Sequence, residues 1–411
     1  MIKRVSFAWL LGACLWAAGC GSPEAQFHLD RVYLYKSVGL PETREDANNL
    51  EKQVQNLKDI MAGLFGTPDD PHVPRLVEVD TREVLREELL RMAAGPVGRD
   101  EQGTPRGLYR EHCAHCHGIT GDGAGPTAAF LNPYPRDYRT GKFKFKSTPL
   151  GKKPTHDDLR RILIDGIPDT AMPSFRLLAD DEIDALVDYV KYLAIRGEVE
   201  RRLVDLLGDV DPGAPLLDPK TRDEDPDLFE EMLAIIQEEV ALVFSNWAEA
   251  PSAVTETPDP PADWLTEESV RHGRELFFNS TTGPCAKCHG QLGLGDGETG
   301  DYDDWVKEID EQNPTAKAAE YLALGLSEPR LIDPRPIRPR NLRAGVYRGG
   351  RRPVDLYLRI KNGIEGTPMP GASAGLTSDD IWRIVAYIRS LPQEPISKPE
   401  GYQVEFDRER M

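Results

Sequence analysis

The chain has 411 residues, of which 29% are charged and 39% are apolar, and it contains 34 prolines. This length allows two or three domains, and the composition favours small domains joined by polar loops over one large core. The formal net charge of −19 would repel the phosphates of a nucleic acid, which excludes nucleic-acid binding as a function class. The acidic balance indicates a solvated surface, with attraction of a basic partner as the alternative.

Residues 1–20 have the pattern of a targeting segment. Lys3 and Arg4 precede the run VSFAWLLGACLWAAG, which is apolar but short for a membrane span. Small residues then lead to Cys20, a pattern that resembles a bacterial lipobox, in which the cysteine becomes the lipidated first residue. Cleavage without lipid and a retained helix are the alternatives. We expect an exported protein with a soluble body, held on the periplasmic side of a membrane by a lipid on Cys20.

Residues 21–102 contain two helical patterns. The first, TREDANNLEKQVQNLKDIMAGLF, is polar, and the second, TREVLREELLRMA, is short and amphipathic. Neither holds a catalytic constellation. We interpret this stretch as a helical spacer or docking region that follows the lipid anchor.

The remainder of the chain contains an internal repeat. Four blocks recur in the same order, each given with its counterpart: CAHCHGITGDG and CAKCHGQLGLGDG, PRDYRTGKF and PRNLRAGVY, DGIPDTAMP and NGIEGTPMP, DDEIDALVDYVKYL and SDDIWRIVAYIRSL. The repeat predicts two homologous modules, at residues 103–198 and 262–394. The second module contains an insertion at about residues 301–338, and residues 395–411 form a tail.

Helical periodicity runs through both modules. In the last repeated block, apolar residues fall on one helical face in both copies: Ile183, Leu186, Val187, Val190 and Leu193, then Ile381, Ile384, Val385, Ile388 and Leu391. Thr377 followed by Asp380 predicts a capping box at the start of the second of these helices. No stretch alternates over strand length, so we predict an all-α fold of two helical modules in tandem.

Residues 199–261 join the two modules. They contain PDLFEEMLAIIQEEVALVFSNWA, whose apolar positions suit a packed helix, followed by the linker PSAVTETPDPPAD. We interpret the segment as a helical linker and expect its helix to pack between the modules.

Four of the six cysteines form two C-x-x-C pairs, and a histidine follows each pair: Cys113, Cys116 and His117, then Cys285, Cys288 and His289. A structural zinc site usually takes two pairs about 12–20 residues apart, whereas these pairs lie about 170 residues apart. A redox dithiol is typical of a βαβ scaffold, which the sequence does not suggest. Haem attachment accounts for every position, because two thiols can bond to one porphyrin and the histidine then lies under its iron.

Two methionines occupy equivalent places in the repeat. Met172 and Met369 each precede a proline in a loop just before the terminal helix. Methionine is an iron ligand in many cytochromes, and it is also a common filler of cores. Because the two recur in T-A-M-P and T-P-M-P, we favour axial ligation.

On these motifs the two modules, about 230 residues together, resemble class I c-type cytochromes, and the whole chain resembles an exported di-haem c-type cytochrome. The resemblance implies three or four helices around each of two covalently attached haem c groups. It implies attachment by Cys113, Cys116, Cys285 and Cys288, proximal ligation of iron by His117 and His289, and distal ligation by Met172 and Met369. The insertion stretches the spacing from His289 to Met369 to 80 residues, against 55 from His117 to Met172, so an exception would lie in the second module.

Arg136 and Arg340 also recur, each after a proline. Their guanidinium groups could pair with haem propionates or form surface salt bridges. The repeated glycines are expected to provide turns that let the backbone pass close to the ring.

A haem with both axial positions filled implies transfer of single electrons. The resemblance implies partners such as a quinol oxidoreductase, a terminal oxidase or another cytochrome, with the membrane reached through Cys20. The alternative is a haem enzyme, a di-haem peroxidase or the cytochrome subunit of a dehydrogenase, in which one sixth ligand is displaceable. We find no catalytic residues, and no signalling domain that a sensory haem module would need.

Overall fold

The computed structural model describes residues 24–77, 79–279, 281, 285–298, 302–326 and 332–394. The predicted targeting segment, Cys20, the tail and part of the insertion therefore lie outside the described residues.

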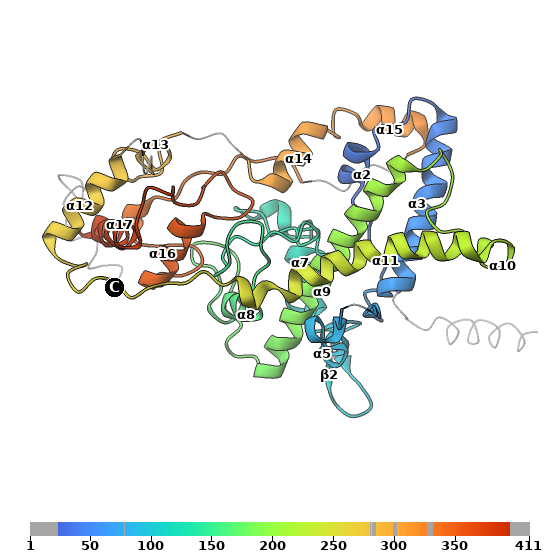
Figure 1. The fold of residues 1–411 in the computed structure, drawn as a ribbon, viewed down its shortest axis with the longest axis horizontal. Helices are drawn as coiled ribbons and strands as arrows, with labels where there is room; N and C mark the ends of the chain where they lie inside the picture. Colours follow the sequence, from blue (N-terminus) through green and yellow to red (C-terminus); the bar gives the residue numbers. More distant parts are fainter. Residues whose placement is uncertain are drawn as a thin grey trace, which may run out of the picture.

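The described residues are almost entirely helical or irregular (Figure 1). The helices are α2 (Arg31–Ser37), α3 (Arg44–Phe65), α4 (Thr81–Val84), α5 (Glu87–Ala93), α6 (Leu108–His112), α7 (Ala114–His117), α8 (His156–Asp165), α9 (Asp180–Leu206), α10 (Thr221–Glu224), α11 (Pro226–Ala248), α12 (Glu267–Phe278), α13 (Cys285–His289), α14 (Asp304–Gln312), α15 (Ala318–Leu324), α16 (Pro353–Asn362) and α17 (Ser378–Ser390). Short 3₁₀ turns are η1 (Ala128–Phe130), η2 (Leu207–Asp209), η3 (Ala250–Ala253), η4 (Leu342–Ala344) and η5 (Leu391–Gln393). Within the described part of the chain, the strands are β1 (Gly98–Arg99) and β2 (Pro105–Arg106), paired antiparallel. The predicted all-α fold class is confirmed.

The second module is built on the crossing of its first and last helices. Helix α12 packs on α17, and the ring of Phe277 contacts that of Tyr387 edge-on at 5.4 Å between centroids. At Gly273 the helices approach so closely that an added Cβ would lie 1.9 Å from the carbonyl oxygen of Arg383. The predicted capping box of Thr377 and Asp380 starts α17 and is confirmed.

In the first module α5 packs on α9 as α12 packs on α17. The β1–β2 hairpin then intervenes between α5 and α6, the helix that leads to the cysteine pair. The helix that pairs with α9 therefore precedes residue 103, where the sequence placed the start of the module. Helix α9 itself continues to Leu206, past the predicted boundary at residue 198.

The helices of the region predicted as a spacer share one hydrophobic core with the first module. Helices α2 and α3 pack on α9, and their buried residues include Leu34, Leu57 and Phe65. This region is thus folded against the first module.

Helix α11 packs along the first module. We expected it between the modules, but its helix contacts are with α9 and α4, and it runs from α10 into the middle of the molecule (Figure 1). Its buried side chains, among them Ile236, Val240 and Phe244, belong to the core of the first module. The physical reason is the extra length of α9, which offers α11 an apolar face that the sequence did not reveal.

The insertion of the second module reaches across to the N-terminal helices (Figure 1). Helix α14 packs on α2, the rings of Tyr321 and Tyr35 stack at 5.2 Å, and Glu308 pairs with Arg201 of α9 at 2.6 Å. Further along, the Arg335 guanidinium donates to the carbonyl of Ala129 at 3.0 Å. The insertion therefore fastens the second module to the first. Among the described residues, no helix combines the length and the apolar character that crossing a membrane requires.

Candidate functional site

The first C-x-x-C-H motif forms one helical turn. Cys113 immediately precedes α7, and Cys116 and His117 end it. Both thiols are free, Cys113 is buried and Cys116 is partly buried. Burial raises the pKa of the Cys113 thiol to about 12. The turn thus presents two thiols and an imidazole within one short segment, the donor set that attachment of haem c requires.

His117 is held in the form that binds a metal. Its Nδ1 lies 3.0 Å from the carbonyl oxygen of Arg136. Because a carbonyl only accepts, Nδ1 carries the hydrogen and the lone pair for a metal is on Nε2. Burial lowers the pKa of His117 to about 4, so the imidazole is neutral. The ring also stacks on that of Tyr138, with 4.6 Å between centroids.

The second motif repeats this geometry. Nδ1 of His289 lies 3.1 Å from the carbonyl oxygen of Arg340, and burial lowers the pKa of His289. Burial also raises the pKa of the Cys285 thiol to about 11. The two partners of the histidine bond are 19 residues apart in the first module and 51 residues apart in the second. The insertion therefore lies between His289 and Arg340 in the sequence, and the hydrogen bond that joins these two residues is the same as in the first module.

A glycine in each module lets the loop after the motif close on the segment that holds the histidine. A Cβ on Gly123 (φ +70°) would lie 2.7 Å from the carbonyl oxygen of Pro135, and one on Gly295 (φ +75°) 2.4 Å from that of Pro339. These glycines thus let the loop after the motif lie against the segment that contains the repeated proline and arginine.

The Met172 loop is fixed by its own hydrogen bonds. The backbone N–H of Met172 donates to Thr170 Oγ1 at 3.1 Å, and that hydroxyl donates to the carbonyl of Ile167 at 2.8 Å. The N–H of Ile167 returns a bond to the carbonyl of Met172 at 3.1 Å. These bonds set the direction in which the methionine side chain leaves the backbone.

The Met369 loop has the same three bonds. Met369 donates to Thr367 Oγ1 at 3.2 Å, Thr367 donates to the carbonyl of Ile364 at 2.8 Å, and Ile364 donates to that of Met369 at 3.1 Å. The long spacing from His289 to Met369 comes from residues before Arg340. It therefore does not alter the hydrogen bonds of this loop.

The arginines that follow the prolines have a role that the sequence did not show. Their backbone carbonyls hold the histidines, while their side chains reach carboxylates: Arg340 Nη1 lies 2.6 Å from Asp169, and Arg136 Nη2 lies 4.0 Å from Asp303. A backbone acceptor leaves no trace in residue type, so no sequence signal could have found it. The predicted pairing with haem propionates stays a prediction.

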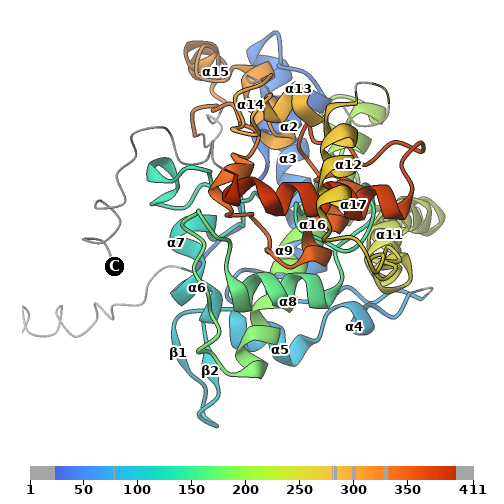
Figure 2. The same cartoon turned by 90° about the vertical axis from the view of Figure 1, so that its left-hand side faces the viewer.

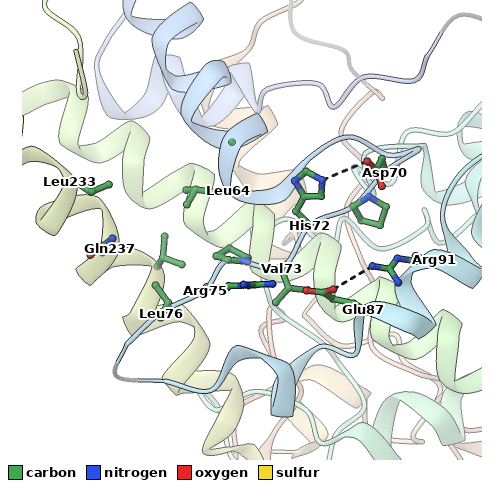
Figure 3. Close-up of a pocket in the computed structure, with 14 residues that line it drawn as sticks. Leu64, Asp70, His72, Val73, Arg75, Leu76, Glu87, Arg91, Leu233 and Gln237 are labelled. Carbon is green, nitrogen blue, oxygen red and sulfur yellow. Dashed lines mark hydrogen bonds and ion pairs between the residues drawn. The ribbon is translucent and has the colours of Figure 1, made fainter. Parts of the chain in front are cut away.

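The large cavity in Figure 3 lies away from both motifs. It has a volume of about 560 Å³ and lies between α3, α5, α11 and the segment around His72. Four of its polar side chains lie in pairs, His72 Nε2 at 3.6 Å from Asp70 and Arg91 at 3.5 Å from Glu87. None of the predicted haem-binding residues lines it.

Comparisons with known proteins place these motifs in a family. The model of cytochrome c oxidase, cbb3-type, subunit III matches residues 100–190, and the cytochrome c model matches residues 270–392. Cytochrome c55X of Paracoccus denitrificans (strain Pd 1222) is 34% identical over 101 residues, which are 24% of this chain and 79% of that protein. A chain of the reducing HAO-like protein complex of Kuenenia stuttgartiensis superposes with a TM-score of 0.46 and 24% identity, covering 72% of this chain and 98% of that one.

The fold and the two repeated motifs define an all-α protein that binds haem covalently and carries electrons. The chain belongs to the c-type cytochromes, as a di-haem member with two haem c groups and their iron. Of the three interpretations of C-x-x-C-H, haem attachment is confirmed.

Proposed function

We propose that this di-haem cytochrome relays single electrons between exported or membrane-bound respiratory partners. The first haem would be held by Cys113, Cys116, His117 and Met172, and the second by Cys285, Cys288, His289 and Met369. The observation that carries this proposal is the repetition of both axial environments, the histidine bond and the methionine loop, at matching distances. Haem iron supplies a reversible one-electron couple.

The chain's own residues keep each site closed and rigid. The carbonyl of Arg136 fixes the ring of His117, and the threonine bonds fix the loop of Met172. A haem bound between residues held in this way would change its geometry little when it takes up an electron, and this would favour fast transfer. It also leaves no position where a substrate would bind, which supports a carrier over a haem enzyme.

Contact between the modules supports a relay within one chain. The Asn362 amide of α16 donates to the carbonyl of Thr148 at 3.3 Å, and Arg161 of α8 lies 3.8 Å from Asp355 of α16. Figure 2 shows α8 and α16 next to each other. The two modules therefore touch, and this contact would let an electron pass between haems of one chain.

The matched oxidase subunit model supports a terminal oxidase as one partner. A quinol oxidoreductase or another cytochrome would be the electron donor, and the net charge of −19 would favour a basic docking surface on either. The direction of electron flow follows from the potentials of these partners.

We further propose that the mature protein is lipidated on Cys20 and held at the periplasmic face of a membrane. The basis is the charged start and the short apolar run that ends at this cysteine. Cells grown with labelled palmitate should yield a labelled membrane-bound chain, and Cys20→Ala should abolish the label and shift the protein to the soluble periplasmic fraction. A wild-type chain without label would contradict the anchor.

The electron-transfer proposal is tested by a reductive titration of the protein with both haems, followed by visible spectra. It should take up two electrons per chain, with low-spin iron throughout.

A further inference from the structure

The Met172 loop contains a residue in an uncommon backbone conformation. Asp169 has φ +59°, in the left-handed region that side chains other than glycine adopt at a cost. The equivalent position in the second module is Gly366, with φ +69°, which adopts this conformation freely. We therefore expect the side chain of Asp169 to make interactions that offset the cost of this backbone conformation.

The carboxylate of Asp169 binds the other module. Its Oδ2 lies 2.6 Å from Nη1 of Arg340 and 3.3 Å from Nη2 of Arg348, and its backbone carbonyl accepts from Arg348 at 3.4 Å. Arg340 is the residue whose carbonyl holds His289. Two arginines of the second module thus bind the loop that carries Met172.

The loop that carries Met369 is likewise bound by the first module. Glu365, four residues before Met369, accepts from Nζ of Lys146 at 2.9 Å and from the backbone N–H of Gly151 at 2.7 Å. Both donors belong to the first module, and the Lys146 side chain is only 4% exposed. Each methionine loop is therefore held by one carboxylate that binds the opposite module.

From this arrangement we propose that each module clamps the methionine loop of the other, so that closure of either haem depends on docking of the two modules. Asp169, with Arg340 and Arg348, is the positioning residue for the Met172 loop, and Glu365, with Lys146, is that for the Met369 loop. The inference rests on the proposed ligation of iron by the two methionines.

Carbon monoxide binding to the reduced protein with both haems tests the clamp, since this ligand binds only where the methionine leaves the iron. Asp169→Gly removes the carboxylate but suits the left-handed turn, as Gly366 shows. Loss of a partly exposed ion pair should raise the rate of carbon monoxide binding at the first haem roughly fivefold. Arg348→Gln, a change in the second module, should open the same first haem, identified by the spectrum of the Met172→Ala protein.

Asp165→Asn is the control in the same segment, because Asp165 pairs with Arg176 of its own module at 3.5 Å and acts on the second module only through the attraction of its charge for Arg352, away from Arg340 and Arg348. It should leave the rate unchanged. Asp169→Asn, which also tolerates the left-handed region, should behave like Asp169→Gly. On the Asp169→Gly background, Arg348→Gln should add little, since the two side chains act through one contact.

The outcomes separate the clamp from the ligand assignment. If the wild-type protein binds carbon monoxide as fast as Met172→Ala, the proposed methionine ligation fails. If the wild type is closed and Met172→Ala is open, but Asp169→Gly is no faster than the wild type, the clamp is wrong and the ligation stands.

Discussion

Met172→Ala converts one haem per chain into a site that binds carbon monoxide stoichiometrically, whereas the wild-type protein should bind almost none. Met172 is the residue that we propose as distal ligand of the first haem, and the bonds of Thr170 and Ile167 fix its backbone. Alanine has no atom that can reach iron, so the sixth position becomes free for an added ligand. The measurement is a carbon monoxide difference spectrum of the reduced protein. Met369→Ala should open the other haem to the same extent.

Met92→Ala is the control for a general loss of stability. Met92 is a buried methionine of α5, 8% exposed, which lies outside both repeated methionine loops in the sequence, and its truncation leaves a cavity. This variant should be less stable than the wild type and still bind no carbon monoxide. A Met172→Ala protein as closed as the wild type would show that another residue completes the site.

Gly273→Ala should strongly destabilise the second module. The added Cβ would lie 1.9 Å from the carbonyl oxygen of Arg383, a backbone atom that cannot move without separating α12 from α17. Overpacking of this kind costs about 1–3 kcal/mol, and the rigid contact places this site at the upper end. Urea unfolding followed by circular dichroism measures the loss.

Gly63→Ala is the matched control, since Gly63 lies within α3 and an added Cβ there meets nothing within 4 Å. Alanine is the better helix former, so this variant should gain about 0.5–1 kcal/mol. A Gly273→Ala protein as stable as Gly63→Ala would mean that the helices cross at a greater distance than described.

The haem motifs could be predicted from sequence because their chemistry is local. Cys113, Cys116 and His117 lie within one helical turn, and the repeat pointed to Met172 and Met369 by position alone. Their roles as individual ligands remain predictions. The helical fold class was also predictable, since the apolar period of α9 and α17 is carried by each helix separately.

Features that depend on distant contacts could not be predicted. The place of α11 depends on how far α9 continues past residue 198. No residue near this point marks where α9 ends, so its C-terminus at Leu206 could not be read from the sequence. The insertion was recognised by its length, but its packing on α2 depends on contacts such as that of Glu308 with Arg201. Asp169 looked like an ordinary loop residue until its φ and its two arginine partners were known.

The central claim is that both haems are closed centres that carry one electron each. An anaerobic reductive titration of the wild-type protein, followed by visible spectra under carbon monoxide, tests it most directly. We predict an uptake of two electrons per chain, with low-spin spectra in both oxidation states and almost no carbon monoxide complex. An uptake of one electron per chain, high-spin ferric iron, or a haem that binds carbon monoxide at once would contradict the account.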